Sequence, residues 1–349
     1  MVDKEREFSP EEQAYLDGYV KKIQQELHLT KDDEINTSDK EKKSQENCRQ
    51  MLNTFFNYWY KKGKKPEQIT KEIVEMVQAS KESAFVGINL RFSSLERVLS
   101  NGEIKSVFEL DDTQTETSRT NDETLDMRRE LEKYLGFDDK QFPKSFAFGT
   151  DQQREKGPAE QYGPFYFSFS EDELPKDTLC IAGDLLNPSG IPESMHTKDY
   201  LEAMKTAMQA SAEDEETGMK IYRDFASCRS HTLEHAPIIQ AMIDLDKKYS
   251  TTSDTTADTD TYSQQMTYIE VLIPKKITIK EASELVVSKE NFAPDEENDK
   301  LMSAYPNFRE FQQEVEQKYG IKIKTTGELN KHLFSDTDLS NYQTWFEQE

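Results

Sequence analysis

The spacing of the apolar residues changes character at Ala84. Before that point, apolar side chains recur every three or four residues, which is the period of an amphipathic helix. After it, short runs such as 85–92 and 266–273 combine apolar, β-branched and aromatic residues, as strands do. These runs alternate with further segments of helical spacing. The order predicts an α+β protein in which a helical N-terminal layer precedes a mixed core.

The chain has 349 residues, enough for one large domain or two ordinary ones. We expect a helical N-terminal region over 1–83, a core of strands and helices over 84–290, and a C-terminal helical extension over 291–349. Residues 250–265, inside the core, are rich in Ser, Thr and Asp and carry almost no apolar side chain. The sequence therefore predicts a disordered loop there.

The charge balance excludes several classes of partner. Lys and Arg number 44 and Asp and Glu number 68, so the net charge is −24. Phosphate backbones and anionic lipids repel such a chain, so we expect neither nucleic acid nor a membrane as a partner. No run approaches 18 apolar residues, and the charged N-terminus lacks the apolar segment of a Sec signal peptide. Three widely spaced cysteines without a CxxC pair suit a reducing compartment.

Two charged residues interrupt otherwise apolar strands. Glu270 stands at the centre of 266–273, on the opposite face from Ile269 and Val271. A buried carboxylate is costly unless it faces a cavity or a partner. Arg91 interrupts 85–92 in the same way. The two side chains would either pair as a structural salt bridge or line one ligand cleft.

A second candidate is His231-Thr232-Leu233-Glu234-His235. On a helix, HxxEH places both imidazoles on one face, where they would hold zinc while Glu234 activates a water, as in inverzincins. Cys228, three residues earlier, would share that face. Because Pro237 follows and would distort the helix end, we interpret the motif as a chance pair and expect no metal.

Three segments in a fixed order carry a resemblance to a known family. They are Ile88–Phe92, then Tyr162–Phe167 closing on Gly183-Asp184, and last Tyr268–Ile273 with the strands of 277–287. This series resembles a family of uncharacterised bacterial proteins known by a domain-of-unknown-function label. That family resembles the mono-ADP-ribosyltransferases, in which an Arg or His on the first strand precedes a Ser/Thr element and a Glu on a late strand. The resemblance covers roughly 85–287.

The resemblance implies a split β-sheet core of the ADP-ribosyltransferase kind over 84–290, with NAD as substrate. Glu270 would be the catalytic glutamate, and Arg91 would hold the NAD pyrophosphate or ribose. Tyr162 would begin a strand that, with Gly163, flanks the nicotinamide. The chemistry suits these residue types, because a fixed carboxylate stabilises an oxocarbenium-like cation and a guanidinium grips phosphate in a fork.

The Ser/Thr element has two candidates. The run 116–121 resembles the family's ETxxSN-type segment, with Thr120 where Ser is usual, and Thr117, Thr120 and Asn121 would contact the cofactor. The alternative is Ser168-Phe169-Ser170, later in the chain. Arginine-modifying transferases also carry Glu-x-Glu, whereas Tyr268 stands two residues before Glu270. The resemblance therefore does not extend to an arginine acceptor.

The resulting hypothesis is NAD-dependent mono-ADP-ribosylation of a protein acceptor, such as a host protein. The protein would be a bacterial toxin or secreted effector acting in a host cytosol, or a cytoplasmic enzyme. Two alternatives stay open at this point. One is a zinc-dependent hydrolase built on 231–235, and the other is a non-catalytic interaction protein with a structural pair between Arg91 and Glu270.

Overall fold

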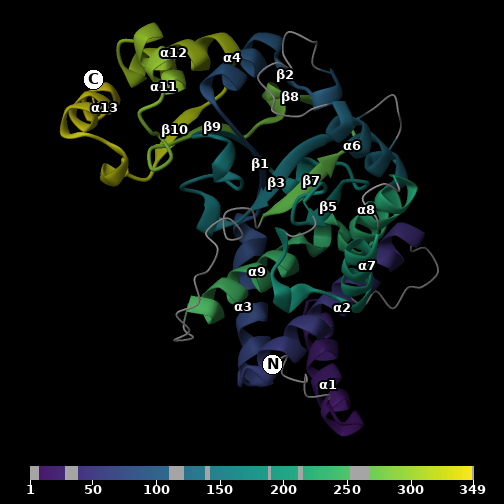
Figure 1. The fold of residues 1–349 in the computed structure, drawn as a ribbon. Helices are drawn as coiled ribbons and strands as arrows, with labels where there is room; N and C mark the ends of the chain where they lie inside the picture. Colours follow the sequence, from purple (N-terminus) through teal and green to yellow (C-terminus); the bar gives the residue numbers. More distant parts are fainter. Residues whose placement is uncertain are drawn as a thin grey trace. The chain divides into compact units, whose positions relative to one another are not determined.

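The computed structural model of the chain describes residues 8–27, 38–109, 122–137, 142–187, 190–210, 215–251 and 268–347. Its contacts form two compact units, which are described separately (Figure 1). Unit 1 comprises 1–82 and 180–269, and unit 2 comprises 83–179 and 270–349. The expected core range of 84–290 is thus divided between the units, and the C-terminal extension belongs to unit 2. Most of the expected loop 250–265 lies outside the described residues.

Unit 1 begins with three helices, α1 (Pro10–Glu26), α2 (Asp39–Lys61) and α3 (Pro66–Ser83). Capping boxes start the first two, because the side chains of Ser9 and Ser38 each accept a hydrogen bond from the backbone N–H three residues later. The described part of the expected N-terminal region 1–83 is thus helical. One face of α2 is buried and consists of Cys48, Met51, Leu52, Phe55, Phe56 and Trp59.

The rest of unit 1 follows residue 180. It contains most of β5 (Leu179–Ala182), then α7 (Lys198–Gln209), α8 (Glu215–Arg229), β6 (Ser230–Thr232) and α9 (Ala236–Thr251). β5 and β6 are neighbouring strands. α2 packs on both β6 and α9. Residues 236–243 of α9 are all buried, so this helix forms part of the core of the unit.

Unit 2 is built on a mostly antiparallel sheet. Its strands lie in the order β10 (Ile323–Thr326), β9 (Glu284–Ser288), β4 (Phe165–Phe169), β1 (Phe85–Leu90), β3 (Lys144–Gly149) and β7 (Ile269–Ile273), whose first residue belongs to unit 1. β1 pairs antiparallel with β3 and β4, and β4 pairs antiparallel with β9, whereas β10 is parallel to β9. The mixed α+β class expected from the sequence is confirmed.

The register of this sheet assigns each side chain to one of two faces. One face is aromatic and aliphatic, and includes Val86, Phe148, Phe165, Phe167, Phe169, Leu285 and Val287. The other, called here the Asn89 face, carries Asn89 and its partner Tyr166, and Gly87 with its partners Ala147 and Ser168. Because side chains alternate along a strand, Ser145 of β3 also lies on the Asn89 face.

Helices and a small second sheet complete unit 2. α4 (Phe92–Asn101) follows β1 directly and ends at Gly102, whose φ of 70° suits glycine. α6 is Asp122–Tyr134, and β2 (Glu103–Ile104) pairs with β8 (Ile277–Thr278). Near the C-terminus lie α11 (Glu296–Ala304), α12 (Phe308–Tyr319) and α13 (Asp336–Glu347). No helix among the described residues is both long enough and apolar enough to cross a bilayer.

Candidate functional site

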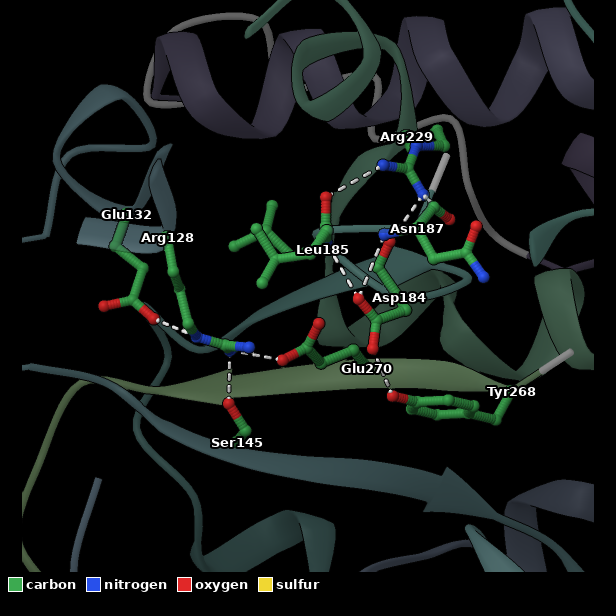
Figure 2. Close-up of polar contacts among 10 residues, drawn as sticks. Arg128, Glu132, Ser145, Asp184, Leu185, Asn187, Arg229, Tyr268 and Glu270 are labelled. Carbon is green, nitrogen blue, oxygen red and sulfur yellow. Dashed lines mark hydrogen bonds and ion pairs between the residues drawn. The ribbon is translucent and has the colours of Figure 1, made fainter. Parts of the chain in front are cut away.

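Glu270 of β7 is buried in an ion pair. Its side chain points toward α6, and its Oε1 atom lies 2.5 Å from Nη2 of Arg128 (Figure 2). Glu270 is 2% exposed. The strand therefore keeps a carboxylate at its apolar centre because a guanidinium from a helix compensates the charge there.

Arg128 holds a second carboxylate as well. Its Nε donates to Oε1 of Glu132 at 2.8 Å, one helical turn further along α6, and Nη2 donates to Oγ of Ser145 at 2.5 Å. The side chain of Arg128 is only 13% exposed. A planar guanidinium with several N–H donors can serve three oxygens at once, which an ammonium group does less well. The contact with Ser145 places the cluster on the Asn89 face of the sheet.

Glu132 is the unusual member of this cluster. It is 2% exposed, and its Oε2 atom has no hydrogen-bond partner among the described residues. Burial raises the pKa of Glu132 to about 7, and the charge of Glu270 acts in the same direction, whereas Arg128 and Lys144 oppose the rise. Lys144, at the start of β3, is itself paired with Glu109 at 2.5 Å. At neutral pH the cluster therefore combines an ion pair with a carboxyl group that gains and loses a proton.

Arg91 lies at the N-cap of α4, immediately after β1. Its backbone is extended, with φ of −77° and ψ of 165°, so alternation from Asn89 puts its side chain on the same face as Glu270. β3 separates β1 from β7, which sets the two strands roughly 10 Å apart. Arg91 is exposed and forms no ion pair with another described residue. The structural pair with Glu270 is thus wrong, because Arg128 takes that place.

The predicted residues Tyr162 and Gly163 lie beside Arg91. Gly163 has a φ of 138°, and a Cβ atom there would stand 2.6 Å from the backbone N of Arg91. The amide of Asn89 fixes this loop by donating to the carbonyl oxygen of Gly163 at 3.0 Å. Tyr162 is 46% exposed and ends a short 3-10 turn, so the expectation that it begins a strand is wrong; β4 starts at Phe165.

The two candidates for the Ser/Thr element differ in what can be said of them. Thr117, Thr120 and Asn121 lie outside the described residues. Ser168 lies on β4 opposite Gly87, is buried, and belongs to the Asn89 face. It is separated from β7 by both β1 and β3. Ser168 thus lies on a strand one place further from β7 than β1, the strand that precedes Arg91.

In unit 1, the HxxEH motif is not on a helix. His231 lies on β6, His235 ends the following 3-10 turn, and Pro237 is the second residue of α9, where proline favours a helix start. The ring centroids of the histidines are 6.4 Å apart. Nδ1 of His235 is 2.7 Å from Oγ of Ser44. Among the described residues, no group of three His, Cys, Asp or Glu side chains is placed to bind a metal.

A second polar cluster of unit 1 fixes the chain around Gly183. Tyr268 donates its hydroxyl hydrogen to Oδ2 of Asp184 at 2.8 Å, and Oδ1 of Asp184 accepts from the backbone of Leu186 at 2.7 Å (Figure 2). Arg229, with no exposed surface, donates to the carbonyl oxygens of Phe225, Ala182, Asp184, Leu185 and Asn187. Carbonyl oxygens thus solvate this buried guanidinium, which makes it a structural clamp of the loop.

Sequence reasoning missed Arg128 and Glu132. Their four-residue spacing on α6 was the available signal, but the same spacing is common on exposed helix faces. Comparisons of the chain with protein-family models, with curated proteins and with solved structures found no significant match.

Proposed function

We propose that the chain is an NAD-dependent mono-ADP-ribosyltransferase that modifies a protein acceptor, with Glu270 as its catalytic carboxylate. The observation that carries the proposal is the burial of Glu270 at the centre of β7 in a 2.5 Å contact with Arg128. A guanidinium fixes the orientation of the carboxylate that it binds. A carboxylate that is already oriented can stabilise a sugar cation without reorganising during the reaction.

In the proposed reaction, Glu270 and Arg91 have different roles. The bond between ribose C1′ and the nicotinamide nitrogen breaks, and nicotinamide leaves with the electron pair. A nucleophile of the acceptor then bonds to C1′ and loses its proton. Glu270 stabilises the cationic ribose between these two steps, as carboxylates do in glycoside cleavage. The exposed guanidinium of Arg91 grips the pyrophosphate in a bidentate fork.

The acceptor is a residue other than arginine in this proposal. Transferases that modify arginine use a first glutamate two residues before the catalytic one, and Tyr268 occupies that position here. The hydroxyl of Tyr268 is engaged with Asp184 at 2.8 Å. A hydroxyl that donates its hydrogen to Asp184 does not supply the carboxylate that those transferases use at this position.

The proposal is tested by incubating the protein with NAD labelled on its adenylate moiety and a cell lysate, and following labelled protein and released nicotinamide. We expect both products with the unmodified chain and neither with Glu270→Gln. Glu314→Gln is the matched control, because Glu314 is half-exposed on α12, where it lies 3.9 Å from Lys318 and interacts with Tyr305. Nicotinamide release that is equal in all three proteins, or absent from the unmodified chain, would contradict the proposal.

A further inference from the structure

Glu132 is a buried carboxylate that the reaction outlined above does not use. It touches Arg128 on one oxygen, at 2.8 Å, and its other oxygen meets no hydrogen-bond donor of the described residues. Burying a carboxyl group with only one of its two oxygens hydrogen-bonded lowers the stability of the fold. A helix face could carry an apolar residue at this position without that cost, so the presence of Glu132 calls for a physical role.

We propose that Glu132 is a positioning residue for Glu270, and that its protonation decides how much of the Arg128 charge Glu270 receives. When Glu132 is ionised, one guanidinium is shared between two carboxylates. When Glu132 is neutral, it no longer competes with Glu270 for the charge of Arg128. The catalytic consequence of this inference rests on the proposed transferase function, but the sharing of charge does not.

The local charge explains why one proton matters. Three elements present charged groups to Glu132, namely α6 with Arg128, β7 with Glu270 and β3 with Lys144. The charge of Lys144 is balanced by Glu109. The remaining cluster of Arg128, Glu270 and Glu132 is neutral when Glu132 carries a proton and has a charge of −1 when it does not.

The charge of the cluster changes within the physiological range of pH. Burial raises the pKa of Glu132 to about 7, so the cluster becomes anionic as the pH rises through neutrality. An anionic cluster stabilises a ribosyl cation better than a neutral ion pair does. NAD cleavage should therefore increase about tenfold between pH 5.5 and pH 8.5 in the unmodified chain. With Glu132→Gln it should stay at the lower level throughout.

A second measurement follows the proton without relying on activity. The folded state holds the proton of Glu132 more tightly than the unfolded state, whose carboxyl has an ordinary pKa. The stabilising effect of neutral Glu132 is complete below about pH 4 and is lost as the pH rises through about 7. Urea unfolding of the unmodified chain should show this decline, and Glu132→Gln should flatten it. Glu130→Gln, a half-exposed site on the same helix, is the matched control and should keep the decline.

The link through Arg128 is tested by repeating the urea series with Glu270→Gln. Glu270→Gln removes a negative charge that raises the pKa of Glu132 and that competes for Arg128, so the midpoint of the decline should move to lower pH. A midpoint that does not move would overturn the proposed coupling, as would a decline that persists in Glu132→Gln. If the decline and its shift are found but no protein cleaves NAD, the charge sharing stands and the proposed function falls.

Discussion

Nη2 of Arg128 and Oε1 of Glu270 are 2.5 Å apart, although the two residues are 142 positions apart in the chain. This contact joins α6 to the centre of β7 and gives a reason for a carboxylate in an apolar strand. Buried ion pairs contribute little net stability compared with apolar residues of similar volume, because both charges lose their hydration. A buried ion pair that exists despite this desolvation cost is a candidate functional site.

Removing the guanidinium should be far more damaging than removing either carboxylate. Arg128→Met removes the guanidinium that two buried carboxylates share, so we expect a loss of about 3–5 kcal/mol in the free energy of unfolding. Urea denaturation near pH 7.5 measures it. Arg309→Met on the exposed side of α12 is the control and should cost well under 1 kcal/mol. Adding Glu132→Gln and Glu270→Gln to Arg128→Met should restore part of the stability, since no unpaired charge then remains.

Glu270→Gln should separate catalysis from folding. Gln keeps the size of the side chain and an oxygen that can accept from Arg128, but it carries no charge to stabilise a ribosyl cation. We expect NAD cleavage to fall about 10²–10³-fold, with NAD affinity and melting temperature nearly unchanged. Single-turnover kinetics give the cleavage rate, calorimetric titration gives the NAD affinity, and a thermal unfolding scan gives the melting temperature. A higher melting temperature with full activity would instead identify Glu270 as a purely structural residue.

Arg91→Ala should affect ligand binding and leave stability alone. Arg91 is exposed and pairs with no other described side chain, so its truncation costs the fold little. Loss of one charge-assisted contact to a pyrophosphate should weaken NAD binding by about 10–100-fold. Isothermal titration with NAD measures the change, and Arg309→Ala controls for the altered net charge. Equal NAD affinity in both variants would remove Arg91 from the binding site.

The strand that precedes Arg91 and the strand that carries Glu270 could be predicted, because their runs of apolar residues indicate extended structure locally. The sequence at β7 is apolar around a single charge, and β1 ends at Leu90, just before Arg91 and the helical spacing of α4. The end of α4 could be predicted in the same way, since Gly102 supplies the left-handed backbone that a helix C-terminus favours. Each of these signals lies within a few residues of the feature it predicts.

Other features depend on contacts between distant segments. Arg128 and Glu132 form an ordinary helical pair in sequence, and only the packing of α6 against β7 makes them part of a buried cluster. The HxxEH motif shows the reverse error. Its spacing suits a helix, but β6 ends at Thr232 and a 3-10 turn follows, so the two imidazoles do not share a helix face. Local spacing alone cannot decide such cases.

The isolated protein should contain no stoichiometric zinc. His235 is engaged with Ser44 at 2.7 Å, Glu234 is exposed, and the rings of His231 and His235 are 6.4 Å apart. Zinc needs its nitrogen ligands about 2.0–2.1 Å from the metal. Rings that lie on two different elements with centroids 6.4 Å apart do not form such a pair of ligands by their spacing alone. Elemental analysis of protein purified without chelators gives the answer. One zinc per chain that disappears in His231→Ala would favour a hydrolase instead.

His231 should make the protein sensitive to acid. The ring is 1% exposed, and burial lowers its pKa to about 3, with the neighbouring His235 adding to the effect. The unfolded chain takes up a proton at this residue below about pH 6.5, whereas the folded chain does not. The stability that neutral His231 contributes is therefore present above pH 6.5 and is lost progressively toward pH 3, by up to about 1.4 kcal/mol per pH unit.

His231→Leu replaces the imidazole with an apolar group of similar size and should reduce this loss of stability. Urea unfolding between pH 4 and pH 7 measures the change. His332→Leu, at an exposed site, is the control. If both variants lose stability in acid as steeply as the unmodified chain, another group governs the acid unfolding.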